Sequence, residues 1–142
     1  MAYTIKRQKD NTIISVDAAK EIDAFLDAAR GLYASMYDFE KIRGRTERVK
    51  IVVEGKSVED LLRAWLQELL DRRSIHGIIY GSFSIVSIQK ISNTQYLLTG
   101  SAHGEAHDPR LHPMINDPHL LPKSISYKGK DKKFSCSFQI TH

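Results

Sequence analysis

Two segments of the chain repeat apolar residues at intervals of three and four, the spacing of one face of a helix. The clearer one runs from Ser57 to Arg73, and Ser57 is expected to begin it by accepting a hydrogen bond from the backbone N–H of Asp60. Its apolar positions are Val58, Leu61, Leu62, Trp65, Leu66, Leu69 and Leu70. This face holds the only tryptophan and is too wide to leave in water, so the pattern predicts a helix packed against a sheet.

The second helical segment covers residues 18–36, and Asp17 stands where a side chain would cap its start. Shorter stretches alternate apolar and polar residues or are rich in β-branched residues, as strands are. They are residues 3–16 (two short strands joined by a turn), 49–53, 78–91, 96–102, 124–127 and 134–140. The pattern predicts an α+β protein, a two-layer sandwich in which a mostly antiparallel mixed sheet of about six strands carries both amphipathic helices on one face.

The composition adds a few constraints to this picture. The 142 residues fit one domain, residues 1–142, with a single core. The lone cysteine, Cys136, lies in an apolar alternation typical of the core; it rules out an internal disulfide and favours a reducing compartment. The first residues, 1–9, lack the apolar stretch of a secretory signal, and no run of about 18 apolar residues could cross a bilayer. We therefore expect a cytoplasmic protein without a membrane partner.

The formal net charge of +4 comes from basic residues that gather at three strand ends or turns. They are Lys6, Arg7 and Lys9, then Arg43, Arg45, Arg48 and Lys50, and finally Lys128, Lys130, Lys132 and Lys133. Charges in such places discourage sheets from pairing edge to edge, and they also suit the phosphates of nucleic acid. A non-catalytic module that binds RNA or protein is thus one hypothesis.

Common catalytic signatures are absent: the chain has no glycine-rich phosphate loop, nucleophile elbow, paired CxxC or helical HExxH. The one stretch with metal-binding residue types lies between positions 103 and 112, at the start of a proline-rich segment that we expect to be a loop from Gly104 to Pro122. A metal-dependent hydrolase or nuclease would use His103, His107 and His112 with Glu105 or Asp108. Ordinary loop histidines are the alternative.

Several strings, in order along the chain, resemble the archease family. Residues 53–88, VEGKSVEDLLRAWLQELLDRRSIHGIIYGSFSIVSI, are similar to its strand, its helix with EDLL, W and ELL, and its next strand. Residues 24–38, AFLDAARGLYASMYD, are similar to its first helix, which ends in Met, any residue and Asp. Further resemblances are the loop residues Gly104, Glu105, Asp108, Pro109 and His112, and the string KSISYKG at 123–129.

The resemblance implies a non-enzymatic protein cofactor of the tRNA-splicing RNA ligase, which joins RNA ends through a guanylate carried on a histidine. The ligase protein would be the partner, and RNA would be contacted only indirectly. Such a cofactor promotes guanylylation and turnover of the ligase. The resemblance also implies a divalent cation, calcium, magnesium or manganese, held by a cluster of acidic residues.

Matched position by position, the resemblance gives the metal ligands as Asp38, Asn11 or its neighbour Asp10, and Thr141 with His142. Lys123 matches a family lysine and is the expected cofactor-binding residue. The family has aspartates where this chain has Asn11 and Thr141. One carboxylate with an amide and a hydroxyl cannot neutralise a dication, and Arg7 and Lys9 lie nearby in sequence. We expect a weak site, a softer metal on the histidines, or replacement of the metal by basic contacts.

Overall fold

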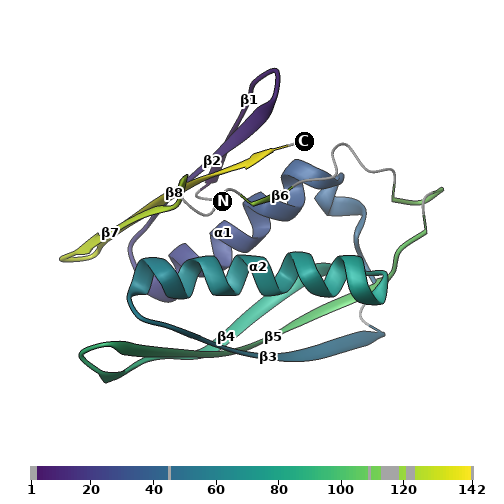
Figure 1. Cartoon of the computed structure of the whole chain (residues 1–142). Helices are drawn as coiled ribbons and strands as arrows, with labels where there is room; N and C mark the ends of the chain where they lie inside the picture. Colours follow the sequence, from purple (N-terminus) through teal and green to yellow (C-terminus); the bar gives the residue numbers. More distant parts are fainter. Residues whose placement is uncertain (1–2, 45, 109, 113–118, 121–123, 142) are drawn as a thin grey trace.

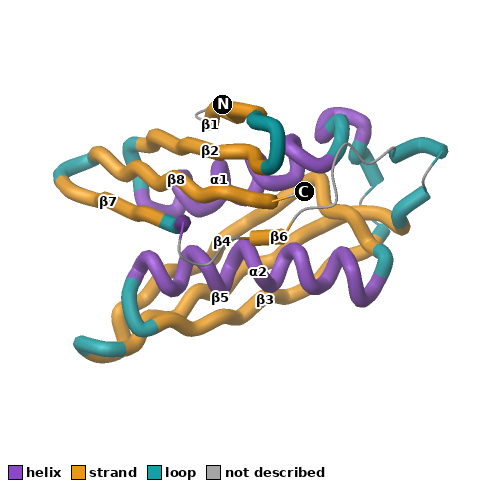
Figure 2. The backbone as a smooth tube through the Cα atoms, turned by 45° about the horizontal axis from the view of Figure 1, so that its top comes forward, coloured by secondary structure: helices purple, strands orange, loops and turns teal. Residues whose placement is uncertain are grey.

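The computed structural model describes residues 3–44, 46–108, 110–112, 119–120 and 124–141. Within these residues two antiparallel sheets enclose a layer of helices, as Figures 1 and 2 show. The first sheet has the order β1-β2-β8-β6, and β7 also pairs with β8. Its strands are β1 (Tyr3–Arg7), β2 (Asn11–Ala18), β6 (His119–Leu120), β7 (Ser126–Lys130) and β8 (Lys133–Thr141).

The second sheet has the order β3-β5-β4, with β5 in the middle. Its strands are β3 (Glu47–Gly55), β4 (Ile78–Ser92) and β5 (Gln95–Ala106). The helices are α1 (Glu21–Met36), the short 3-10 helix η1 (Phe39–Lys41) and α2 (Val58–His76). No helix in the described part of the chain is long and apolar enough to span a membrane.

Helix α1 is apolar on more than one side, and this places it between the sheets. On one side Gly31 lets it approach β2 so closely that a Cβ there would lie 2.8 Å from Ile14 Cγ2. On another side the Tyr33 ring packs against Tyr80 and Phe83 of β4, with centroids 6.1 and 5.5 Å away. A helix buried on both sides needs small residues where a sheet comes close, and Ala24, Ala28 and Ala29 are also fully buried.

Helix α2 confirms the predicted helix and its predicted cap. The Ser57 hydroxyl accepts from the Asp60 N–H at 3.0 Å, and Gly77 ends the helix in the left-handed conformation at φ 64°. The Trp65 indole donates to the Phe25 carbonyl of α1 at 3.1 Å, and the Tyr33 hydroxyl donates to the Leu69 carbonyl at 3.1 Å. Two buried hydrogen bonds therefore fix the two helices against each other.

The α+β class and the antiparallel pairing are confirmed. The strands form two sheets with the helices between them, whereas the sequence indicated a single sheet with both helices on one face. Alternation along a strand is the same whichever sheet it joins, so the pattern could not separate them. The predicted cap Asp17 is wrong. β2 continues through Ala18 because it pairs with β8 as far as Phe134, and α1 begins after Lys20 without a side-chain cap.

Trp65 provides a test of the helix contact. Trp65 is fully buried, so we expect Trp65→Ala to lower the free energy of unfolding by about 3–5 kcal/mol, since it removes the largest buried ring and its hydrogen bond. Ile75→Ala on the same helix is the control; Ile75 is 73% exposed, and its change should stay within about 0.5 kcal/mol. Urea unfolding of both variants measures the difference, and equal losses would contradict this packing.

Candidate functional site

The start of β2 and the end of β8 bring two of the predicted metal ligands together. Asn11 pairs with Thr141, which pairs on its other side with His119 of β6. The Asn11 side-chain N–H donates to Gln139 Oε1 at 3.3 Å, while its oxygen Oδ1 is buried and has no hydrogen-bond partner among the described residues. An orphaned buried acceptor is uncommon, and such groups mark places that receive a donor or an ion.

The remaining predicted ligands are less closely assembled. Asp38 follows the end of α1 and precedes η1; its side chain is 56% exposed and lies 3.7 Å from the Lys41 amine. Asp10 is exposed in the turn between β1 and β2. Lys123 and His142 lie outside the described residues. The roles of all these residues stay predictions.

Sequence reasoning did not assign a place to Arg7, and the structure gives it one. Arg7 ends β1 opposite Thr12, beside Asn11, and its guanidinium donates to the Ser35 carbonyl at 3.3 Å. Ser35 belongs to the last turn of α1, three residues before Asp38. A positive charge therefore lies at the negative end of the helix dipole. The features of the sequence that pointed here were the basic residues from Lys6 to Lys9 and the closeness of Arg7 to Asn11 along the chain.

These groups do not fit a hard dication of the kind that the resemblance implies. Such ions need several carboxylates to offset their dehydration, whereas β2 and β8 contribute an amide and a hydroxyl. Asp38 already faces Lys41, and the guanidinium of Arg7 adds positive charge at the end of α1. Among the described residues, no three His, Cys, Asp or Glu side chains come together in a way that could hold a metal.

A second group of polar residues ties the end of β5 to the segment before β3. Glu105 Oε1 accepts from the backbone N–H of Arg43 at 2.9 Å and of Gly44 at 3.0 Å, and faces His112 Nε2 at 3.4 Å. The Gly44 N–H does most to lower the pKa of Glu105; Arg43 and His112 lower it further, while burial acts in the opposite direction. Glu105 is therefore held as a carboxylate.

The histidines of this group use their nitrogens inside the protein. His112 is buried, and its Nδ1 accepts from the Asp108 N–H at 3.1 Å, so the ring proton lies on Nε2 and faces Glu105. His107 Nε2 donates to the His112 carbonyl at 3.0 Å. These contacts hold the segment in one conformation.

His103 does not join this group. It lies in the middle strand of its sheet, where it pairs with Arg48 of β3 on one side and Ser82 of β4 on the other. β5 also continues through Ala106, so the predicted start of the loop at Gly104 is wrong. A Cβ on Gly104 would overlap the Ile79 carbonyl, and this close approach of β4 explains the glycine. The geometry gives the hydrolase hypothesis no support.

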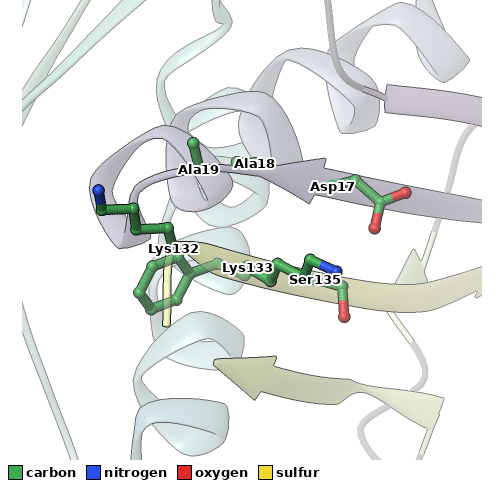
Figure 3. Close-up of a pocket in the computed structure, with 7 residues that line it drawn as sticks. Asp17, Ala18, Ala19, Lys132, Lys133 and Ser135 are labelled. Carbon is green, nitrogen blue, oxygen red and sulfur yellow. The ribbon is translucent and has the colours of Figure 1, made fainter. Parts of the chain in front are cut away.

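The β7–β8 hairpin carries four lysines at its tip: Lys128, Lys130, Lys132 and Lys133. Lys130 lies directly opposite Lys133, and Asp131 and Lys132 have positive φ angles of 49° and 64°. Beside the tip is an open pocket of about 510 Å³, where Figure 3 shows the Lys132 amine and the Asp17 carboxylate at opposite ends. The pocket is shallow and carries no convergent set of polar groups, so the lysines themselves are the notable feature.

Comparisons with known proteins agree on one family. Residues 10–130 match the model of the Archease protein family (MTH1598/TM1083). The chain is 35% identical over 105 residues to Protein archease of Pyrococcus furiosus, a match that covers 74% of this chain and 69% of that protein. It is 30% identical over 105 residues to Protein archease of Methanopyrus kandleri, covering 74% and 70%.

Among solved structures, the solution structure of Methanobacterium thermoautotrophicum protein 1598 is similar, with a TM-score of 0.77 over 99% of each chain. At 16% sequence identity this similarity shows a shared fold. The arrangement of strands and helices described above is therefore one that another protein also adopts.

Glu105 provides a test of the second group. Its pKa is lowered from 4.5 on folding, so the carboxylate stabilises the folded chain above that pH, and this stabilisation is lost as the pH falls through the folded value. Glu105→Gln should cost about 1–2 kcal/mol at pH 7 and flatten the fall in stability below pH 4.5. Urea unfolding between pH 7 and pH 3 measures both effects. Glu54→Gln, exposed in β3, is the control, and the same profile in both variants would contradict the assignment.

Proposed function

The chain belongs to the archease family, and we propose that it is an accessory protein that promotes guanylylation and turnover of a GTP-dependent tRNA-splicing RNA ligase. The observation that carries this proposal is the family match over residues 10–130. The match includes the segment that Glu105 and His112 hold in place. The similarity thus extends to a loop with its own hydrogen-bond network as well as to the core.

The chemistry of the described residues supports a role through binding. Cys136 is buried, and this burial raises the pKa of its thiol to about 12, which keeps it protonated and unreactive at neutral pH. The ring nitrogens of His112 and the Nε2 of His107 are engaged within the protein. These groups are poor candidates for a nucleophile and its base, as expected of a protein that acts on a partner enzyme.

The end of the molecule where α1 stops is the surface that we assign to the ligase. Asp38 is exposed there, and its carboxylate lies 3.7 Å from the amine of Lys41, which is exposed as well. Arg7 and the β1–β2 turn lie beside the same helix end. A surface with exposed carboxylates, Asp38 among them, and the positive charge of Arg7 offers a partner oriented polar contacts.

The test is a guanylylation assay with the cognate ligase, GTP and manganese. We expect the chain to raise the fraction of guanylylated ligase over many turnovers. Asp38→Asn should reduce this stimulation at least about tenfold, the size of one lost charged contact at an interface, without unfolding an exposed position. Glu54→Gln, exposed in β3, is the matched control and should stimulate fully.

Two results would count against this proposal. Absence of stimulation by the unchanged chain, with the ligase active on its own, would exclude the cofactor role. Equal stimulation by Asp38→Asn and Glu54→Gln would keep the role but exclude the assigned surface.

A second candidate function, binding of single-stranded RNA, is favoured by the β7–β8 hairpin. Like charges directly opposite each other on paired strands destabilise a sheet, and Lys130 faces Lys133 in this way. Lys132 also adopts a left-handed conformation that glycine would adopt at lower cost. Lysine at these places therefore adds positive charge at a cost in local stability. Lysine side chains bind phosphates, whereas stacking on bases needs exposed aromatic rings.

Salt dependence tests this candidate. A fluorescein-labelled single-stranded RNA should bind more weakly as salt rises, because bound lysines release counterions. Lys130→Gln/Lys132→Gln should reduce the slope of log K against log salt by about 1–2, since each lysine contributes about 0.7–1. Lys56→Gln/Lys90→Gln, after β3 and in β4, is the charge-matched control and should leave the slope unchanged. An equal loss in both pairs would contradict a site at the hairpin.

A further inference from the structure

We infer that Arg7 replaces the divalent cation, so that a guanidinium built into the chain holds the end of α1 and supplies its positive charge without a metal. This inference deepens the proposed function. The effect of Arg7 on the ligase rests on that function being correct. Its central claim, that the chain needs no divalent cation, concerns the chain alone.

The position of Arg7 is the first argument. The residue ends β1 opposite Thr12, so its backbone lies next to Asn11, the residue that the resemblance assigns to the metal. Its guanidinium reaches across to α1 and donates to the Ser35 carbonyl at 3.3 Å. The contact joins the β1–β2 hairpin to the last turn of α1, and a cation shared between these two segments would join the same parts of the chain.

The second argument is that the C-terminal end of helix α1 lacks a positive group of its own. The last turn of a helix leaves carbonyl groups without intrahelical donors and carries partial negative charge. α1 has no basic residue in its own last turn. Ser35 is buried, and its hydroxyl donates back to the Leu32 carbonyl at 2.6 Å, so this side chain satisfies a different carbonyl. Arg7 is therefore a positive group from another element at a helix end that has none of its own.

Charge balance is the third argument. The residues assigned to the metal contribute an amide at Asn11 and a hydroxyl at Thr141, which suit a monovalent donor better than a dication. The orphaned Asn11 Oδ1 carries a partial rather than a full negative charge. A dication placed beside Arg7 would face repulsion from the guanidinium, and Asn11 and Thr141 supply no carboxylate to offset it. The amide of Asn11 and the hydroxyl of Thr141 are thus consistent with an arginine beside them.

The first experiment measures metal binding by the full chain. Its Tm is recorded in chelator and then with calcium, magnesium or manganese, and isothermal titration with each ion accompanies the scan. We expect no change in Tm and no heat of binding for the unchanged chain. The variant Arg7→Gln/Asn11→Asp/Thr141→Asp restores carboxylates and removes the guanidinium, so its Tm should rise by about 3–8 °C with metal and fall again with chelator.

Three results would overturn the inference. The first is a rise in the Tm of the unchanged chain that chelator reverses. The second is a folded triple variant that binds no metal, because charge would then not be what separates this site from a cation site. The third is a variant Asn11→Asp/Thr141→Asp that keeps Arg7 and binds metal as tightly as the triple variant.

The second experiment isolates the charge of Arg7. Arg7→Gln should lower Tm by about 1–3 °C, the effect of one exposed charge at a helix end, and should reduce stimulation of the ligase several-fold. Arg7→Lys keeps the charge and should restore most of both. Lys90→Gln, exposed in β4, is the control and should behave like the unchanged chain.

The two experiments separate this inference from the proposed function. If the unchanged chain does not stimulate the ligase at all, the proposed function fails, while metal binding and Tm still decide the role of Arg7. If it stimulates and Arg7→Gln, Arg7→Lys and Lys90→Gln all act alike, the proposed function stands and the role of Arg7 is refuted.

Discussion

The structure depends on α1 being buried from two directions. Its small residues face β2, where Gly31 meets Ile14, and its large ring Tyr33 faces β4 and reaches the Leu69 carbonyl of α2. A helix covered on both sides is shielded along its length, so it meets solvent and partners chiefly at its ends. Both groups of polar residues described above lie at or just beyond one end of α1. Arg7 and Asp38 lie at its C-terminal end, and Glu105 binds the backbone of Arg43 in the segment that follows.

Sequence periodicity predicted the helices and most strands correctly, because burial on one face imposes its spacing directly on the residue order. It could not assign strands to sheets, since the alternation of β2 and of β3 is the same whichever sheet each joins. Asp17 was wrongly assigned as a cap because the pattern does not contain the pairing with β8 that extends β2 past it. Long-range pairing is the information that a local pattern lacks.

The candidate site shows the same division between local and long-range information. The family resemblance predicted Asn11 and Thr141 as metal ligands, a role that stays a prediction. In the structure the two residues are neighbours although they are far apart in the chain. The contact between Arg7 and Ser35 could not be predicted, because it depends on how a hairpin sits on a helix end. Likewise, the spacing of His107 and His112 resembled a metal motif, whereas their hydrogen bonds show that they hold the loop together.

The place of β8 also bears on how the chain folds. This strand lies inside the first sheet, where it pairs with β2 over the whole length from Asn11 to Ala18, yet it comes near the end of the sequence. Contacts between residues so far apart in the chain close large loops and slow folding. Until β8 emerges from the ribosome, the edge of β2 that β8 will cover is open and available for wrong pairing. Lys6 and Lys9 in the β1–β2 hairpin are well placed to keep it soluble meanwhile.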